Sequence, residues 1–188
     1  MVAVAVLALV PLLLFVTLHR PFPSDTSPEG AYMRIARSVG EDDPRGFFAY
    51  LETEAQWACF TVHDMRAKAS KRIAASYPEP QRSEMLEQYK AAAEAADGSD
   101  VFALLYRERG WGRRLRKDMS GVVKVEIEGD RASVVTAQGT RYPFRRRDNG
   151  IWGLTIFTAE LLGDAEKATR DLAVVNAAAD DYERAKKK

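Results

Sequence analysis

The residue types that could do chemistry are few, and they are far apart along the chain. His63 and Asp64 form the only histidine–acid pair in the main part of the chain, and such a pair could act as general base and general acid. Successive residues on a helix point about 100° apart, so these two side chains cannot easily orient one another. They are weak catalytic candidates, and a pair on a helix surface is the favoured interpretation.

The remaining reactive groups argue against several kinds of site. Cys59 is the one cysteine, which excludes an internal disulfide, and its place between Trp57 and Phe60 is typical of a buried, inert thiol. One cysteine and two distant histidines argue against a zinc site. Gly110-Trp111-Gly112 lacks the strand–turn–helix context of a phosphate-binding loop. We therefore expect no bound metal and no cofactor.

Basic side chains gather in two clusters. The clusters are Arg113, Arg114, Arg116 and Lys117, and then Arg145, Arg146 and Arg147. Beside a membrane, such side chains contribute about 1 kcal/mol each to contact with anionic lipid head groups, and they could equally bind an acidic protein partner. A solvated face balanced by nearby acids is the favoured interpretation of both clusters. The whole chain has 28 Lys and Arg against 27 Asp and Glu, a net charge of +1, so we expect no nucleic-acid partner.

Arg146 differs from its neighbours in its predicted strand position. Side chains alternate along a strand, so Arg145 and Arg147 share one face. Arg146 then shares the other face with Tyr142 and Phe144. A charged side chain on a core-lining face needs an acidic partner or a bound anion, which makes Arg146 the leading candidate for a ligand contact. The predicted pocket is lined by Arg146, Tyr142, Trp57 and Trp152.

Residues 121–157 are predicted to hold these arginines on a small sheet. The first strand alternates charged residues with Val123, Val125 and Ile127, the pattern of a half-buried strand. Three more strands follow, separated by the tight turns Gly129-Asp130, Gln138-Gly139 and Asp148-Asn149-Gly150. Connections this short require antiparallel neighbours. We expect an α+β fold with a curved, four-stranded antiparallel meander covered by helices, and Pro143 places the third strand at an edge or a bulge.

Helices are predicted on both sides of this segment in the chain. Ser27 and Asp43 each precede a proline, which is the signal for a helix N-cap. Thr53 is expected to begin a helix that stops before Pro78. Further helices are expected over residues 83–96, from a cap at Asp100 to a break at Gly110 and Gly112, and from Thr158 or residues 163–164 into a long C-terminal helix.

The chain begins with an almost uninterrupted run of Val, Ala and Leu, which can span most of a hydrocarbon core about 30 Å thick. A cleaved signal peptide is the alternative, but the run has no basic start and no small-x-small cleavage site after it. We predict an uncleaved transmembrane signal anchor over residues 1–20, a linker over 21–30 and an α+β domain over 31–188. A strict positive-inside count at Arg20 favours a cytoplasmic domain, but it rests on one residue, and we expect an extracytoplasmic domain.

Three short motifs carry a resemblance to a known family. They are the capped helix start Ser27–Tyr32, the segment Phe47–Leu51 after Asp43-Pro44, and Asp148-Asn149-Gly150-Ile151-Trp152. In this order they resemble the nuclear-transport-factor-2-like superfamily, with its cystatin-like cone, and especially small bacterial, membrane-tethered members of unknown function. The resemblance covers residues 27–157 and implies a curved antiparallel sheet at the bacterial cytoplasmic membrane. Residues 67–112 are more helical than that fold requires, and the helix after Phe157 is an addition.

The function expected from these observations is a non-enzymatic, membrane-anchored binding or scaffolding module that acts with a protein partner. The predicted anchor and the lack of a convergent catalytic set favour it. The family includes both enzymes and binding modules, so the resemblance alone does not choose between them. The alternatives are a small-molecule-binding, isomerase-like or dehydratase-like domain that uses the cone interior, and an anionic-lipid surface binder that uses the arginine clusters.

Overall fold

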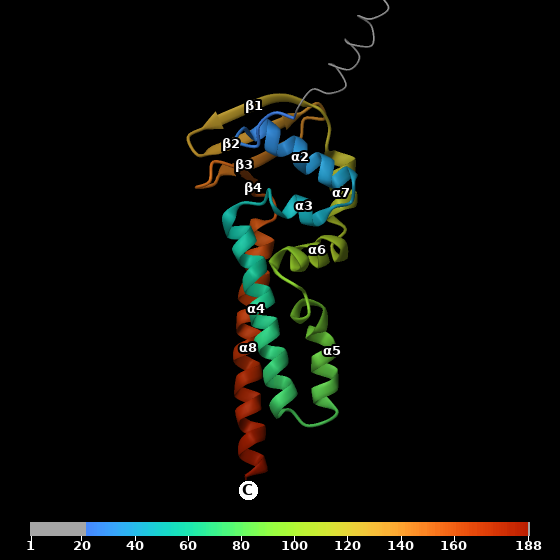
Figure 1. The fold of residues 1–188 in the computed structure, drawn as a ribbon, viewed down its shortest axis with the longest axis vertical. Helices are drawn as coiled ribbons and strands as arrows, with labels where there is room; N and C mark the ends of the chain where they lie inside the picture. The colour runs from blue at the N-terminus through green and yellow to red at the C-terminus, as the bar shows by residue number, and fades with distance from the viewer. Residues whose placement is uncertain (1–21, 188) are drawn as a thin grey trace, which may run out of the picture.

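The computed structural model describes residues 22–187, and the predicted anchor over residues 1–20 lies outside them. Within the described range the chain is α+β, with seven helices and one four-stranded antiparallel sheet. The sheet and the short helices form a head at one end, and longer helices run away from it as a stalk (Figure 1). No helix within residues 22–187 combines the length and the apolar character needed to cross a membrane.

The head is built on the predicted meander. Its strands are β1 (Val122–Glu128), β2 (Arg131–Thr136), β3 (Arg141–Arg146) and β4 (Trp152–Leu154). They lie in the order β1-β2-β3-β4, each antiparallel to the next, which confirms the predicted topology. Gly129 and Gly150 allow two of the tight turns, since they adopt φ of 61° and 82°, a region that residues with a Cβ rarely enter.

The predicted edge position of the third strand is wrong. β3 lies between β2 and β4, and Pro143 pairs with Ser133 of β2. A proline is tolerated there because β4 is short and its register with β3 covers residues 144–146. The one further bond at Pro143, from the Thr155 N–H to Pro143 O (3.1 Å), needs no donor from the proline. The irregularity falls instead in the edge strand β1, where the register shifts between Val122 and Lys124.

The helices follow the predicted order. They are α2 (Pro28–Gly40), α3 (Pro44–Phe48), α4 (Thr53–Ser76), α5 (Gln81–Ala93), α6 (Gly98–Glu108), α7 (Trp111–Asp118) and α8 (Thr158–Lys186). The predicted break between α6 and α7 occurs at Gly110, whose φ of 64° ends the helical path. Of the two predicted starts for the last helix, the structure has the earlier one, at Thr158.

Side-chain caps explain where two of these helices begin. Ser27 Oγ accepts a hydrogen bond from the main-chain N–H of Gly30 (3.1 Å), which confirms the predicted cap of α2. The predicted cap of α6 at Asp100 is wrong. Asp97 holds that position, and its Oδ1 accepts a hydrogen bond from the main-chain N–H of Ser99 (2.8 Å). The helix therefore begins at Gly98, one turn earlier than its sequence pattern indicated.

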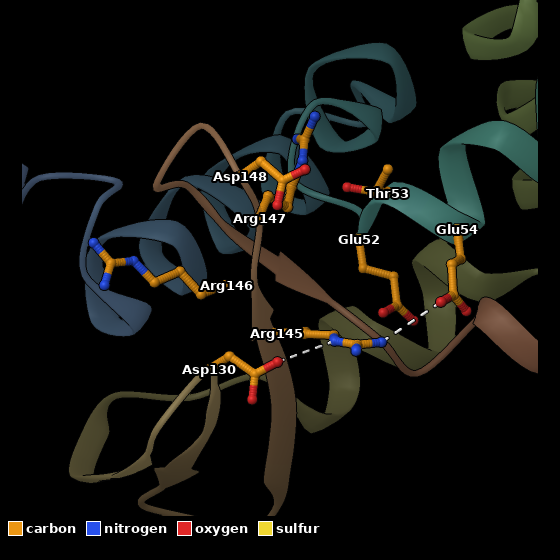
Figure 2. A pocket seen from close by; sticks show the side chains of 8 residues that line it. All are labelled: Glu52, Thr53, Glu54, Asp130, Arg145, Arg146, Arg147 and Asp148. Carbon is orange, nitrogen blue, oxygen red and sulfur yellow. Dashed lines mark hydrogen bonds and ion pairs between the residues drawn. The ribbon is translucent and has the colours of Figure 1, made fainter.

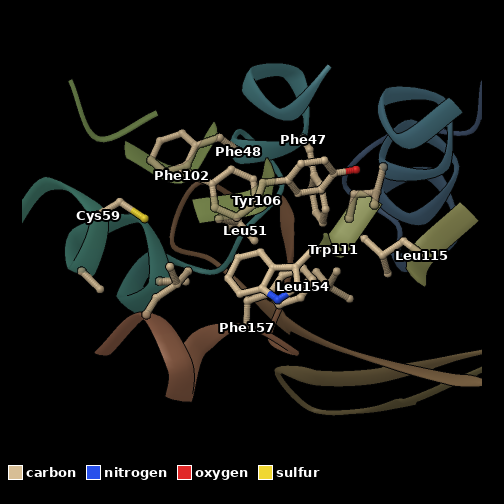
Figure 3. Close-up of a cluster of buried hydrophobic side chains, with 14 of the residues drawn as sticks. Phe47, Phe48, Leu51, Cys59, Phe102, Tyr106, Trp111, Leu115, Leu154 and Phe157 are labelled. Carbon is tan, nitrogen blue, oxygen red and sulfur yellow. The ribbon is translucent and has the colours of Figure 1, made fainter. Parts of the chain in front are cut away.

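An aromatic core fills the space between the sheet and the short helices (Figure 3). Phe47, Phe102 and Phe157 are fully buried, and Trp111 stacks on Phe157 with ring centroids 4.0 Å apart. Each such aromatic pair adds about 0.5–1.5 kcal/mol to the effect of burial. From the sheet, Leu154 of β4 enters the same cluster. Side chains therefore occupy the covered face of the meander.

The stalk has a smaller core of its own. α4 and α8 run in the same direction, as successive ion pairs Arg66–Asp171 and Arg72–Asp180 show, and α5 packs beside α4 (Figure 1). The residues of this second cluster are Ala69, Ile73, Tyr77, Tyr89, Val175 and Ala179. The stalk helices thus pack on one another through an apolar cluster that is separate from the core beneath the sheet.

Candidate functional site

The residues predicted to line one pocket are spread over different parts of the head. Tyr142 and Trp152 are buried in the core, and Trp57 is 67% exposed on α4. Arg146 pairs directly with the buried Trp152 of β4, so it lies on the same sheet face as Tyr142 and Phe144, as predicted. Its side chain is nevertheless exposed, because that face is not covered at the last residue of β3. In Figure 2 the Arg146 side chain extends away from Glu52.

A polar hollow of about 260 Å³ lies where the ends of β2 and β3 meet the start of α4 (Figure 2). It is lined by Glu52, Thr53, Glu54, Asp130, Arg145, Arg146, Arg147 and Asp148. Arg145 stands between two carboxylates, with its guanidinium 3.5 Å from Glu54 and 3.4 Å from Asp130. These side chains are about half exposed, so water screens the pairs and each contributes little to stability.

Glu52 is the buried member of the hollow, with 6% of its surface exposed. Its carboxylate accepts a hydrogen bond from the Thr158 hydroxyl at the start of α8, and its main-chain N–H donates to Leu154 O (3.2 Å). Gly153 permits this approach, because a Cβ on Gly153 would lie 2.5 Å from the Glu52 Cα. Glu52, which directly precedes α4, therefore joins α4 to β4 and α8, a role the sequence did not signal because Leu154 and Thr158 lie about a hundred residues later in the chain.

Arg147 was predicted to lie on a membrane or partner surface, and it instead makes an internal clamp. Its Nη1 donates to Ala49 O and its Nη2 donates to Gln56 Oε1, both at 2.9 Å. Its Nε is buried without a partner, and burial lowers the pKa of the guanidinium. The three arginines at the end of β3 therefore differ: among the described residues Arg146 has no ion pair, Arg145 bridges two carboxylates, and Arg147 holds the β3–β4 turn to Ala49 and to α4.

The balance of charge in this hollow suits a network of ion pairs. Four carboxylates face three guanidiniums, and the buried carboxylate is already hydrogen-bonded to a threonine. A binding site for an anion would need an excess of positive charge. The ion pairs and hydrogen bonds around this hollow thus hold the start of α4 against the sheet. The charges that line the hollow do not indicate a particular ligand.

The two predicted acid–base candidates, His63 and Asp64, lie in different surroundings on α4. Asp64 pairs with Lys68 one turn further along α4 (2.7 Å), and His63 is half-buried beside it on the same helix. Cys59 is fully buried, and burial raises the pKa of its thiol to about 12. Within residues 22–187 no cluster of three or more His, Cys, Asp or Glu side chains has the arrangement of a metal site.

Two aromatic side chains form an exposed ridge on the other side of α4 from its core contacts. Trp57 (67% exposed) and Phe60 (41% exposed) touch with ring centroids 6.3 Å apart. Phe60 also meets the buried ring of Phe48 at 5.9 Å, so the ridge rests on the rigid core. A sequence signal existed, because α4 has apolar residues on two faces. Its core face is Ala55, Ala58, Cys59 and Val62.

Four of the eight residues of α7 are basic, and α7 packs beside α2. Arg116 donates to Val39 O (3.2 Å) and lies 3.4 Å from Asp42. The Arg114 guanidinium lies 5.9 Å from the ring centre of Phe157. Arg113, Arg114 and Lys117 are exposed and have no ion pair among the described residues. Arg113 and Lys117 in addition lie over no aromatic ring there, so we take these two as the leading cations of this cluster for contact with a ligand.

Comparisons of the chain with protein-family models, with curated proteins and with solved structures find no match, so the resemblance to the nuclear-transport-factor-2-like superfamily stays a prediction.

Proposed function

We propose that the chain is a non-enzymatic binding or scaffolding module, held at a membrane by residues 1–20, that acts with a protein partner. The aromatic ridge of Trp57 and Phe60 carries this proposal. Exposed tryptophan is rare on protein surfaces and is strongly enriched among the residues that dominate binding energy. A ridge fixed on the core loses little side-chain entropy when a partner covers it.

The surroundings of the ridge fit the rim of a protein interface. Gly98 of α6 approaches it so closely that a Cβ there would lie 2.8 Å from the Phe60 ring. Next to Gly98 stand the α6 cap Asp97 and the ion pair of Arg45 with Asp100. Polar groups around an aromatic centre exclude water from it once a partner binds. The ridge therefore has an apolar centre and a charged border.

The test is affinity purification of the full chain from detergent-solubilised membranes. We expect the wild-type chain to retain a partner in a constant ratio, and Trp57→Ala to weaken retention about 30-fold, which corresponds to the loss of a hot-spot side chain worth about 2 kcal/mol. Val174→Ala is the matched control, since Val174 is equally exposed at 68% but lies on α8. Equal retention by the two variants, or no retained partner for the wild type, would refute the proposal.

A second candidate function rests on α7. We propose that Arg113 and Lys117 contact anionic lipid head groups. α7 lies beside α2, which follows the predicted anchor and linker in the chain. Phe22, at the start of the described residues, lies under the guanidiniums of Arg34 and Arg37 at 5.7 Å and 5.9 Å. Positive charge near the anchor would favour a negatively charged membrane surface.

A further inference from the structure

The two edge strands of the sheet differ in whether another segment pairs with their outer side. At the β4 edge, residues 50–52 close the sheet: Leu51 bridges Leu154, whose main-chain N–H donates to Tyr50 O (2.8 Å). At the β1 edge, no segment of residues 22–187 pairs with the strand on its outer side. An open edge presents unpaired main-chain donors and acceptors that can accept another strand.

Hairpin geometry identifies the groups that β1 presents. The two-residue turn at Gly129-Asp130 makes Glu128 and Arg131 a hydrogen-bonded pair, and such pairs alternate along an antiparallel ladder. Lys124, Glu126 and Glu128 therefore direct their main-chain groups toward β2. The N–H and C=O of Val125 and Ile127 point outward, away from β2.

Apolar side chains along this edge are also exposed to solvent. Ile127 is 60% exposed and Val123 is 64% exposed. A hollow of about 460 Å³ lies along the end of the hairpin, lined by Glu126, Ile127, Glu128, Arg131, Ala132 and Ser133. In Figure 1 the β1–β2 hairpin projects past the helices of the head. A strand that docked on this edge would cover exposed apolar surface as well as free main-chain groups.

We propose that β1 pairs with β1 of a second copy of this chain, antiparallel and across a two-fold axis at Val125, so that the two sheets become one of eight strands. The outward main-chain groups of Val125 then pair with the same groups of the second copy. Lys124 stands opposite the second copy's Glu126, and by symmetry Glu126 stands opposite the second copy's Lys124.

The charges of β1 select this register. A two-fold axis at Lys124 would place Lys124 opposite itself, and an axis at Glu126 would place Glu126 opposite itself. An axis at Ile127 would oppose Glu126 and Glu128. Like charges directly opposite one another are destabilising, whereas the axis at Val125 yields two opposite-charge pairs. The shift in register between Val122 and Lys124 limits regular pairing to the segment on which these charges lie.

A charge swap tests both the pairing and its register. The full chain in mild detergent is measured by sedimentation velocity over a range of concentrations, and we expect a reversible dimer. Lys124→Glu and Glu126→Lys each place like charges opposite one another, so each should weaken dimerisation by about tenfold or more. The double variant Lys124→Glu/Glu126→Lys restores opposite charges and should restore the dimer.

An equal mixture of the two single variants is the control for effects inside one copy, because Lys124 also pairs with Glu126 of its own strand (2.8 Å). In the mixture each copy keeps like charges on its own strand but faces opposite charges on the other copy, so the dimer should return. A monomer at all concentrations, or a double variant as weak as the single ones, would overturn the proposal. Trp57→Ala should not change dimerisation. The test of the dimer can therefore fail or succeed independently of the test of the proposed protein partner.

Covalent trapping gives a second measure. Val125→Cys places a thiol on the proposed two-fold axis, and a short thiol–thiol cross-linker should join two copies through it. Ser133→Cys on β2 should not be joined. The native Cys59 is buried and does not compete. Equal trapping of the two cysteine variants would contradict pairing through β1.

Discussion

At the scale of single residues, burial decides what Cys59 can do. The thiol is fully buried, and desolvation raises its pKa to about 12, with a smaller contribution from the charge of Asp164. The thiolate is the reactive form of cysteine, so this side chain is inert at neutral pH. The sequence indicated this outcome through the apolar residues on either side of Cys59.

The raised pKa of Cys59 makes a prediction about alkaline pH. The unfolded thiol ionises near its ordinary pKa of about 9, whereas the folded thiol stays protonated up to about pH 12. Between these two values the thiol can ionise only in the unfolded state, so its contribution to stability is complete below pH 9 and is lost as the pH rises from 9 toward 12. We expect Cys59→Ala to flatten the fall in free energy of unfolding over this range, measured by urea denaturation.

Tyr142 supplies the control for that measurement, because burial raises the pKa of its phenol to about 12 as well. Tyr142→Phe should remove the share of the stability loss at alkaline pH that is caused by the phenol. The share caused by the Cys59 thiol should remain. If the free energy of unfolding of Cys59→Ala fell with pH as steeply as that of the wild type, the pKa of the thiol would not differ between the folded and unfolded states as expected.

The arginines of β3 show what alternation can predict from sequence and where it fails. The rule places Tyr142 and Phe144 correctly in the core. It also gives the correct face for Arg146, which pairs with the buried Trp152, but it cannot predict that this face is left uncovered at the last position of the strand. It also could not find the role of Arg147, whose partners come from α3 and α4, about a hundred residues earlier in the chain.

At the scale of elements, local signals predicted most boundaries. Ser27 and Asp43 cap their helices as expected, and the meander has the predicted order because short turns permit only neighbouring antiparallel strands. The error at α6 has a local reason, since Asp97 and Asp100 are both able to cap. The pairing of α4 with α8 could not be predicted, because it depends on contacts between residues about a hundred positions apart.

The far end of that helix pair depends on Glu183. Its carboxylate accepts hydrogen bonds from the Ser76 hydroxyl and from the Arg72 guanidinium, both at 2.6 Å. These bonds lower its pKa, the hydroxyl contributing most. The carboxylate therefore stabilises the stalk above its ordinary pKa of 4.5, and this stability is lost as the pH falls through the lower, folded value.

We expect Glu183→Gln to loosen the end of α8 without affecting the head. The measurement is amide hydrogen exchange, which should be several-fold faster in the last turns of α8 and unchanged in β2 and β3. Lowering the pH should loosen the wild type in the same place and change the variant less. Glu166→Gln is the control, because the ion pair of Glu166 within residues 22–187 is with Arg170 on the same helix. Equal effects of the two variants would argue against a specific tie at Glu183.

At the scale of the whole molecule, the head and the stalk offer different surfaces. The head has a closed core, an open sheet edge at β1 and a basic helix at α7, whereas the long helices carry exposed apolar side chains, among them Trp57 and Phe60 on α4 and Val174 on α8. A dimer formed through β1 would carry two heads in one continuous sheet and two ridges of Trp57 and Phe60. Partner binding and lipid contact then use surfaces that the dimer leaves uncovered.

Lipid contact by α7 can be tested on the full chain reconstituted in nanodiscs. Arg113 and Lys117 together are worth about 2 kcal/mol near an anionic surface, so the amides of α7 should exchange more slowly when phosphatidylglycerol is present than in phosphatidylcholine alone. The difference should shrink as salt rises, because exposed charges are screened beyond about 10 Å at 0.1 M. Arg113→Glu/Lys117→Glu should abolish it, while Arg170→Glu on the stalk should not. Equal exchange in the two kinds of disc at low salt would remove lipid contact from the functions proposed for this molecule and leave the aromatic ridge as its proposed binding site.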